Sequence, residues 1–184
     1  MRLRRILFLP PLLLFFLLPL AADPQQVQEG VLKISSPVFE NSQNIPRRYA
    51  CDGKNVNPPL GIENVPVKAK SLALIFDDRD APGGTFVHWI LWNIDPGVKE
   101  IKEDSVPEGA VQGTNDFKKR SYGGPCPPSR AHRYDFRIYA LDTRLKLEPK
   151  SRKADLEKAM KGHVVAQAKM TGLYKKNPKG SSEP

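Results

Sequence analysis

Cysteine is scarce in this sequence: Cys51 and Cys126 are the only two among 184 residues. There is no Cys-x-x-Cys pair and no cysteine–histidine cluster at zinc-ligand spacing, which argues against a structural zinc site. Nothing in the sequence indicates a cofactor. In an exported protein, an even pair of cysteines can form one disulfide. Spacing alone does not show that Cys51 and Cys126 meet, so a disulfide and two free thiols both stay open.

A dense stripe of positive charge is also missing. The chain has 29 Lys and Arg against 20 Asp and Glu, a formal net charge of +9. The basic residues form only small clusters, at residues 47–48, 118–120 and 175–176, unlike a nucleic-acid-binding surface. We therefore predict no nucleic-acid partner. A mildly basic surface would suit anionic headgroups or acidic partners, although an ordinary solvated charged surface is the simpler explanation of these residues.

No apolar run is long enough to predict a stable membrane span. Residues 6–20 are almost purely apolar, but a span needs about 20 such residues, and three prolines interrupt this run. Three arginines precede the run and two alanines follow it, a pattern typical of a secretory signal. We predict a signal peptide at residues 1–22, cleaved after Ala22, and a periplasmic or secreted protein. An uncleaved N-terminal anchor is the alternative.

The remaining sequence predicts one domain without internal repeats. We expect a flexible leader at residues 23–30, a domain at 31–174 and a disordered basic tail at 175–184. Frequent proline and glycine, 18 and 13 residues, predict many short elements joined by turns. Hydrophobic residues at 40% of the chain are sufficient for a packed core.

The pattern of these elements is mainly β. Strands are expected at residues 31–39, 71–77, 86–94, 134–141 and 164–174. The runs at 71–77 and 86–94 are apolar on both alternating faces, which indicates central strands covered on both sides. A short helix is expected at 152–161, with Ser151 as N-cap and Gly162 at its end. Together they predict a β-sandwich with one or two peripheral helices.

Two segments carry polar groups in apolar surroundings. Residues 78–84 read DRDAPGG and form a loop after a buried strand. Strand alternation then places His88 on one face with Phe86, Ile90 and Trp92. The second segment, residues 122–134, reads YGGPCPPSRAHRY. Its glycines permit close approach of a ligand, its prolines stiffen the loop, and the strand that follows places His132, Tyr134 and Phe136 on one face.

These two segments resemble the signature segments of the phosphatidylethanolamine-binding protein family, most closely its bacterial Raf-kinase-inhibitor-like branch. The resemblance rests on DRDAP at 78–82 with His88-Trp89, and on residues 122–134 ending in HRY. It extends to CDG at 51–53, NPPL at 57–60 and LEKAMKGH at 156–163. It therefore covers most of the chain from residue 31 to residue 174.

The resemblance implies a large antiparallel sheet packed on a smaller one, with helices at the periphery. It also implies a small pocket for phosphate-like or carboxylate anions. Arg79 departs from the family pattern, because many relatives have proline there. By matching position, the pocket residues would be Asp78, Asp80, His88, Gly124, Pro127, Pro128, His132 and Tyr134.

The residues themselves support an anion pocket. Histidine N–H, the Tyr134 hydroxyl and the N–H groups of a glycine-rich backbone can all donate to an anionic oxygen. Two free carboxylates would repel an anion, so we predict that Asp78 or Asp80 is bound to a histidine or to loop N–H groups. Either carboxylate could orient a histidine and favour its charged form.

Alternative functions use the same residues. Asp78, His88 and His132 could serve a hydrolase or a metal-dependent enzyme, but no nucleophile accompanies them. Ser129 lacks a Gly-x-Ser-x-Gly pattern, and a second metal-ligand motif is missing. We therefore predict a non-enzymatic protein that binds a small anion or a phosphorylated headgroup. Inhibition of a partner protein is the other candidate, and for an exported chain a protease suits better than a kinase.

Overall fold

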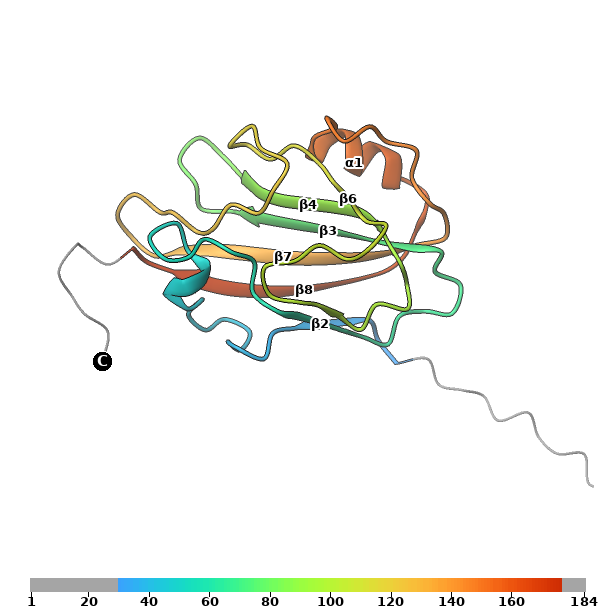
Figure 1. Ribbon diagram of the computed structural model, residues 1–184, viewed down its shortest axis with the longest axis horizontal. Coiled ribbons are helices and arrows are strands. Elements are labelled where there is room, and N and C mark those ends of the chain that lie inside the picture. Colours follow the sequence, from blue (N-terminus) through green and yellow to red (C-terminus); the bar gives the residue numbers. More distant parts are fainter. Residues whose placement is uncertain (1–29, 177–184) are drawn as a thin grey trace, which may run out of the picture.

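The structure, a computed structural model, describes residues 30–176 and contains two antiparallel sheets (Figure 1). The predicted signal peptide, nearly all of the predicted leader and most of the predicted tail lie outside these residues. The fold class predicted from the sequence, mainly β with a large and a small sheet and peripheral helices, is confirmed.

The large sheet has five strands in the order β6-β4-β3-β7-β8, and the small sheet has three in the order β1-β2-β5. A single α-helix, α1, and one turn of 3-10 helix, η1, complete the elements of the described residues. The bounds in chain order are β1 Lys33–Ser35, η1 Arg47–Tyr49, β2 Leu60–Glu63, β3 Ser71–Asp78, β4 Phe86–Ile94, β5 Glu100–Ile101, β6 Val111–Gln112, β7 His132–Leu141, α1 Lys153–Met160 and β8 Val164–Tyr174.

Apolar side chains form two cores, one on each face of the large sheet. The first lies between the sheets and joins Ile34 and Leu60 of the small sheet to Leu74 and Phe136 of the large one. The second joins the outer face of the large sheet to α1 and includes Ile75, Trp92 and Leu156. All eight residues of β3 are buried, as predicted for a central strand covered on both sides. Figure 1 shows the resulting layers, with α1 on one side of the large sheet and β2 on the other.

A bulge in β4 changes the face on which His88 lies. Phe76 of β3 pairs with Trp89, and the next residue, Asp77, pairs with Val87. His88 is therefore an extra residue without a partner in this ladder. Bulges of this kind re-aim side chains next to functional sites.

The predicted neighbours of His88 are therefore partly wrong. Phe86 does share its face, with ring centroids 5.3 Å apart. Ile90 and Trp92 instead lie in the second core, toward α1. His88 faces the first core, where its ring lies 5.3 Å from that of Tyr134. The physical reason is the inserted residue, which breaks the alternation on which the prediction was based.

The first predicted strand is shorter than expected, three residues rather than 31–39. The chain turns immediately after β1, where the Ser36 hydroxyl donates to the Pro59 carbonyl at 2.7 Å and accepts the Val38 N–H. Pro37 has no N–H to continue a ladder. These contacts end the strand at Ser35.

Helix α1 also begins later than predicted, with Arg152 rather than Ser151 as its N-cap. The Asp155 carboxylate accepts the Arg152 N–H at 2.9 Å, which is half of a capping box. Ser151 belongs to the preceding turn, since its N–H donates to the Glu148 carbonyl at 2.8 Å. Gly162 follows the helix end with φ of +82°, as its predicted role requires.

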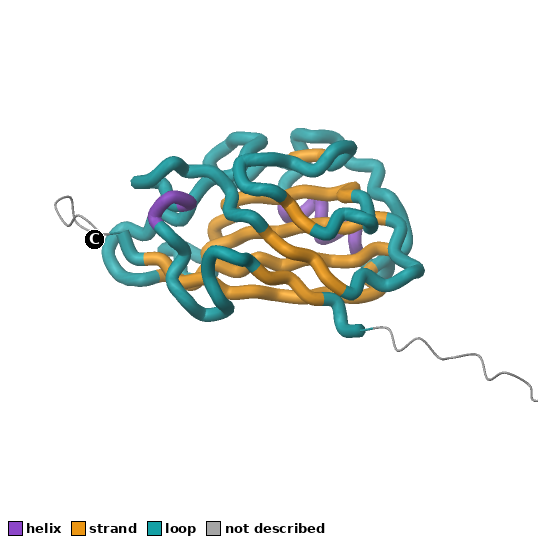
Figure 2. The backbone as a smooth tube through the Cα atoms, turned by 60° about the horizontal axis from the view of Figure 1, so that its bottom comes forward, coloured by secondary structure: helices purple, strands orange, loops and turns teal. Residues whose placement is uncertain are grey.

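The long loops gather at one end of the sandwich, because β3 and β8 end there while β4 and β7 begin there. This is the left end in Figure 1, and Figure 2 shows η1 among the same loops. Both segments singled out in the sequence lie at this end. Within residues 30–176, no helix is long and apolar enough to cross a membrane.

Candidate functional site

A cavity of about 170 Å³ opens at the loop end of the large sheet, where the two sequence segments meet. Most of its wall is apolar, and its polar groups come from the end of β3, the bulge in β4 and the start of β7. Its lining consists of Asp78, Ala81, Pro82, Phe86, His88, Phe117, Cys126, Pro128 and His132.

Asp78 and His132 form a buried pair in this wall. Asp78 is the last residue of β3 and is 4% exposed, and His132 is the first residue of β7 and is 2% exposed. The His132 Nδ1 lies 2.7 Å from the Asp78 Oδ2, and the Asp78 Oδ1 accepts the Asp80 N–H at 2.9 Å. The carboxylate therefore has a partner on each oxygen, and it orients the histidine ring as a donor at Nδ1.

Asp80 is engaged by Arg133 in the same way. Its Oδ2 accepts the backbone N–H of Arg133 at 2.9 Å and the Nε–H at 2.8 Å. The hydrogen bonds from the Arg133 side chain hold the pKa of Asp80 well below its usual range. The prediction that Asp78 or Asp80 is bound to a histidine or to loop N–H groups is thus confirmed for Asp78. The Asp80 carboxylate is also bound, by Arg133.

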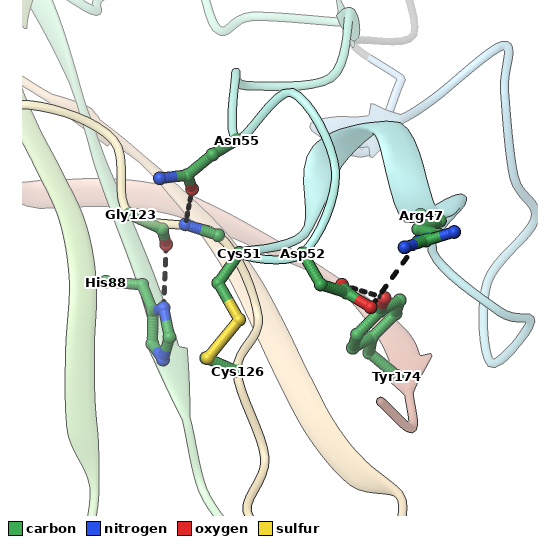
Figure 3. Close-up of a disulfide and its surroundings, with 9 residues drawn as sticks. Arg47, Cys51, Asp52, Asn55, His88, Gly123, Cys126 and Tyr174 are labelled. Carbon is green, nitrogen blue, oxygen red and sulfur yellow. Dashed lines mark hydrogen bonds and ion pairs between the residues drawn. A yellow bond between two sulfur atoms is a disulfide. The ribbon is translucent and has the colours of Figure 1, made fainter. Parts of the chain in front are cut away.

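His88 is buried beside the Asp78–His132 pair. Its Nδ1 lies 2.7 Å from the Gly123 carbonyl, and its ring is 3% exposed (Figure 3). The ring centroid lies 5.4 Å from that of Phe76 and 5.2 Å from that of Phe117. Burial among these aromatic rings lowers the pKa of His88 below its ordinary value of 6.5. The ring is therefore neutral near pH 7.

Tyr134 lies against both histidines, with ring centroids 5.3 Å from His88 and 6.4 Å from His132. Burial raises the pKa of its hydroxyl, with the nearby Asp78 charge as a second cause, so the group stays protonated. The oxygen is fully buried, and its hydrogen-bonding neighbours are the Asp78 side chain and the Cys126 backbone.

The Gly/Pro loop is fixed to the segment that follows η1. Cys51 and Cys126 form a disulfide, and the Cys51 N–H donates to the Pro125 carbonyl at 3.0 Å (Figure 3). The Gly124 N–H donates to the Asn55 Oδ1 at 2.7 Å. The disulfide left open by the sequence is therefore present, and it places Cys126 in the cavity wall.

These contacts correct one expectation about the loop. The sequence suggested that glycine N–H groups would donate to a ligand. Instead, the Gly124 N–H is used by Asn55 and the Gly123 N–H donates to the His88 carbonyl at 3.1 Å. The two glycines serve close packing of the loop, not donation into the cavity.

Gly124→Ala should destabilise the protein by about 1–3 kcal/mol, because a Cβ there would lie 2.4 Å from the Tyr49 carbonyl oxygen and 2.8 Å from the Asn55 Oδ1. The Tyr49 carbonyl accepts the Tyr122 hydroxyl at 2.9 Å, and the Asn55 Oδ1 accepts the Gly124 N–H itself. Urea unfolding of the two proteins measures the difference. An unchanged midpoint and slope would show that the loop can move away from the segment carrying Tyr49 without cost.

Two residues that the sequence reasoning missed also shape the site. Asn115 is 1% exposed, and its side-chain amide donates to the His88 carbonyl at 3.1 Å and to the Ser121 carbonyl at 2.9 Å. Phe117 closes the wall beside His88. The sequence Asn-Asp-Phe at 115–117 is not a distinctive motif, and only the long-range fold brings these residues to the cavity.

The comparisons with known proteins agree with this geometry. The family model described as phosphatidylethanolamine-binding protein matches residues 35–175. The chain belongs to this family. A relative named UPF0098 protein from Methanothermobacter thermautotrophicus is 49% identical over 150 residues, which are 79% of this chain and 99% of that protein. Another from Aquifex aeolicus is 45% identical over 155 residues, 80% of this chain and 91% of that protein.

Two solved structures of the family share the fold. One, from Chlamydia trachomatis, is described as a proposed homologue of phosphatidylethanolamine-binding protein. It is 39% identical, covers 80% of this chain and 99% of its own, and gives a TM-score of 0.77. The other, YbcL of E. coli, is described as a member of the mammalian family. It is 29% identical, covers 80% of this chain and all of its own, and gives a TM-score of 0.76.

The structure separates the eight family pocket positions into groups. Asp78, His88, Pro128 and His132 line the cavity. Tyr134 lies behind the two histidines, and Asp80 holds Arg133 at the rim. Gly124 lines a neighbouring cavity of about 330 Å³, and Phe117 lines both cavities. Pro127 is a buried residue of the loop itself.

The departure from the family pattern at Arg79 has a structural role. Its guanidinium lies 3.7 Å from the Asp135 carboxylate, which is fully buried on the outer face of the large sheet. The residue points away from the cavity side, so the departure leaves the pocket chemistry unchanged. Among residues 30–176, no group of three or more His, Cys, Asp or Glu side chains is placed to hold a metal ion.

Proposed function

We propose that this protein binds a small oxyanion, such as phosphate, a carboxylate or a phosphorylated headgroup, in the 170 Å³ cavity. The observation that carries the proposal is a pair of buried histidines in a wall whose carboxylates are already engaged. Asp78 is held by His132 and by the Asp80 N–H, and Asp80 is held by Arg133. Neither carboxylate therefore opposes an anion as a free charge would.

Donors for an anion can come from the two histidines. Each histidine uses Nδ1 within the protein and leaves Nε2, which carries a hydrogen and donates to an anion when the ring is protonated. The Tyr134 hydroxyl lies behind the two histidines and does not line the cavity. Because the surrounding wall is apolar, each of these hydrogen bonds is stronger than it would be in water.

Binding is favoured over catalysis by the composition of the cavity wall. The lining contains no serine, no threonine and no free thiol, since Cys126 is in the disulfide. The Asp78–His132 pair resembles a general base with its orienting carboxylate, but no nucleophile lies beside it in the lining. We therefore propose a binding protein without enzymatic activity.

Export to the periplasm or the medium is part of the proposal. The basic and apolar pattern of residues 1–22 supports it, and so does the Cys51–Cys126 disulfide, because structural disulfides persist mainly outside the cytosol. N-terminal sequencing of the protein recovered from its producing cell tests this point. A mature chain that begins at Asp23 is expected, and a chain that still begins with Met1 in the cytosol would contradict it.

His132→Ala should weaken binding of phosphoethanolamine by about tenfold to a hundredfold, because one charge-assisted hydrogen bond is worth roughly 1.5–3 kcal/mol. Isothermal titration calorimetry measures the effect. His163→Ala is the matched control, since His163 pairs with Asp142 at the opposite end of β7 and is about half exposed. Equal affinity of the wild type and His132→Ala would remove His132 from the site.

A further inference from the structure

We propose that the outer face of the large sheet carries an anion site of its own, separate from the cavity, which binds a doubly charged oxyanion such as sulfate or a phosphate group. Arg79 and Lys169 hold the anion above the buried carboxylate of Asp135. The proposal is independent of the function proposed for the cavity. The cavity residues Asp78 and His132 lie on the opposite face, because side chains alternate between the two faces along β3 and β7.

Cross-strand pairing builds the site from three neighbouring strands, β3, β7 and β8. Asp135 of β7 lies opposite Asp77 of β3 on one side and Thr171 of β8 on the other. Two residues further along β7, Arg137 pairs with Lys169 of β8. Residues at alternate positions of a strand share a face, so these side chains all project from the outer face of the sheet.

Three cationic groups converge on one oxygen of Asp135. The Arg137 Nη2 lies 2.9 Å from the Asp135 Oδ2, and the Arg79 Nη1 and the Lys169 Nζ lie 3.7 Å and 3.9 Å from the same atom. The three positive charges are therefore close to one another and repel. An anion among them would offset this repulsion.

The buried carboxylates do not need Arg79 or Lys169 for their hydrogen bonds. Asp77 and Asp135 are fully buried, and every one of their oxygens accepts a hydrogen bond from another group. The donors are the Arg137 guanidinium, the Lys153 ammonium and the Thr171 hydroxyl. Arg79 and Lys169 thus add positive charge to a cluster that is already satisfied.

The donors of these two cations are unused. At 3.7 and 3.9 Å from Asp135, both heads are beyond hydrogen-bond distance, and neither makes a side-chain hydrogen bond within residues 30–176. The side chain of Arg79 is 40% exposed and that of Lys169 is 48% exposed. Helix α1 packs against β4 and lies away from β8, so it leaves this part of the face open (Figure 1).

The other charges nearby are paired among themselves. Glu157 of α1 lies 3.7 Å from the Lys153 ammonium, and the Asp80 carboxylate holds Arg133. The surplus of positive charge is therefore located at Arg79 and at a lysine on the far side of β7 from it. An oxyanion with two charges and several oxygens can accept from both cations at once, whereas chloride has one charge to share between them.

The test is an NMR titration of the isotope-labelled, disulfide-bonded protein with sodium sulfate and, separately, with methyl phosphate. Each probe replaces sodium chloride at constant ionic strength, which keeps screening constant. The amide signals of Lys169 and Thr171 report on the outer face, and those of Gly123 and His132 report on the cavity. We expect the signals of the outer face to shift and to saturate.

The two probes distinguish the sources of the anion. Saturation with sulfate assigns the site to a free ion, and saturation with methyl phosphate alone assigns it to a phosphate group carried by an ester. Outer-face signals that do not shift with either probe, or that shift linearly without saturation, would overturn the proposal. Because the cavity has signals of its own, that result is independent of whether the cavity binds an anion.

A double variant tests the two cations. Arg79→Gln/Lys169→Gln should weaken binding at the outer face by at least about tenfold, because charge-assisted hydrogen bonds from both residues are lost. Arg144→Gln/Lys146→Gln is the matched control, since it removes the same charge from exposed residues beyond the end of β7 and should bind as the wild type does. Equal affinities of the two double variants would overturn the assignment. If the first does not fold, the single variants Arg79→Gln and Lys169→Gln replace it, and each should weaken binding severalfold.

Discussion

Arg137→Met is expected to lower the free energy of unfolding by about 3 kcal/mol. Arg137 lies on β7 and bonds both oxygens of Asp77 through Nη1, at 2.9 and 2.8 Å, and the Asp135 Oδ2 through Nη2 at 2.9 Å. Both carboxylates are fully buried, and they are paired neighbours across β3 and β7. Removal of the guanidinium leaves two like charges side by side in the outer face of the sheet.

The other members of this cluster set the size of the effect. The Lys153 Nζ lies 2.6 Å from the Asp77 Oδ2, and the Thr171 hydroxyl donates to the Asp135 Oδ1 at 2.7 Å. These contacts remain in the variant. They therefore keep the loss of unfolding free energy near the lower end of the values typical for breaking a buried ion pair. Lys153 is the first residue of α1, so the cluster also joins the helix to the sheet.

Urea unfolding of the wild type and of two variants measures this prediction. Arg48→Met is the control, because its ion pair with Glu103 lies at the surface with side chains 44% and 33% exposed. Its loss should cost less than about 1 kcal/mol. If Arg137→Met costs no more than Arg48→Met, the remaining cations, Lys153 at Asp77 and Arg79 and Lys169 at Asp135, neutralise the cluster and the assignment to Arg137 is wrong.

The sequence predicted the central strands well because their pattern is local. Residues 71–77 and 86–94 are apolar on both faces, and the structure places them in the middle of the large sheet with cores on both sides. The local pattern of these strands does not predict the ionic cluster of Asp77, Asp135 and Arg137. Asp77 reads as the polar end of a strand, and nothing near it in the sequence identifies Arg137, 60 residues away, as its partner.

The site was predicted in its residues but not in its geometry. Family motifs supplied Asp78 and His132, yet their contact spans 54 residues and depends on the pairing of β3 with β7. The orientation of His88 depends on a bulge, which is set by the register against β3 rather than by the residues of β4 themselves. Periodicity alone therefore could not place His88 on the correct face.

The loop between Tyr122 and His132 shows a third limit. Its glycines suggested free N–H groups for a ligand, but the structure uses them to join the loop to Asn55 and His88. Whether a backbone group is free depends on contacts between residues far apart in the chain. Composition shows that a loop can approach another surface closely, and it does not show which surface.

The double variant Cys51→Ser/Cys126→Ser should be less stable than the oxidised protein by about 4 kcal/mol. The bond joins residues 75 apart, and the chain-entropy estimate for closing a loop of that length is of this size. Urea unfolding with and without a reducing agent measures it, because reduction of the wild type should reproduce the variant. Mass analysis of the unreduced protein, recovered from its producing cell, is the control, and two free thiols there would contradict the prediction at its first step.

Anion binding should respond less than stability to the loss of this bond. The Gly124 N–H still donates to Asn55 and the Cys51 N–H still donates to Pro125 in the reduced protein, so the loop keeps its native contacts while the protein stays folded. The disulfide acts mainly by restricting the unfolded chain. We therefore expect phosphate affinity to fall by no more than about threefold, well under the roughly tenfold that 1.4 kcal/mol represents. A much larger loss of affinity in the folded variant would show that the disulfide positions residue 126 and Pro128 in the cavity wall. The disulfide would then matter more for binding than for stability.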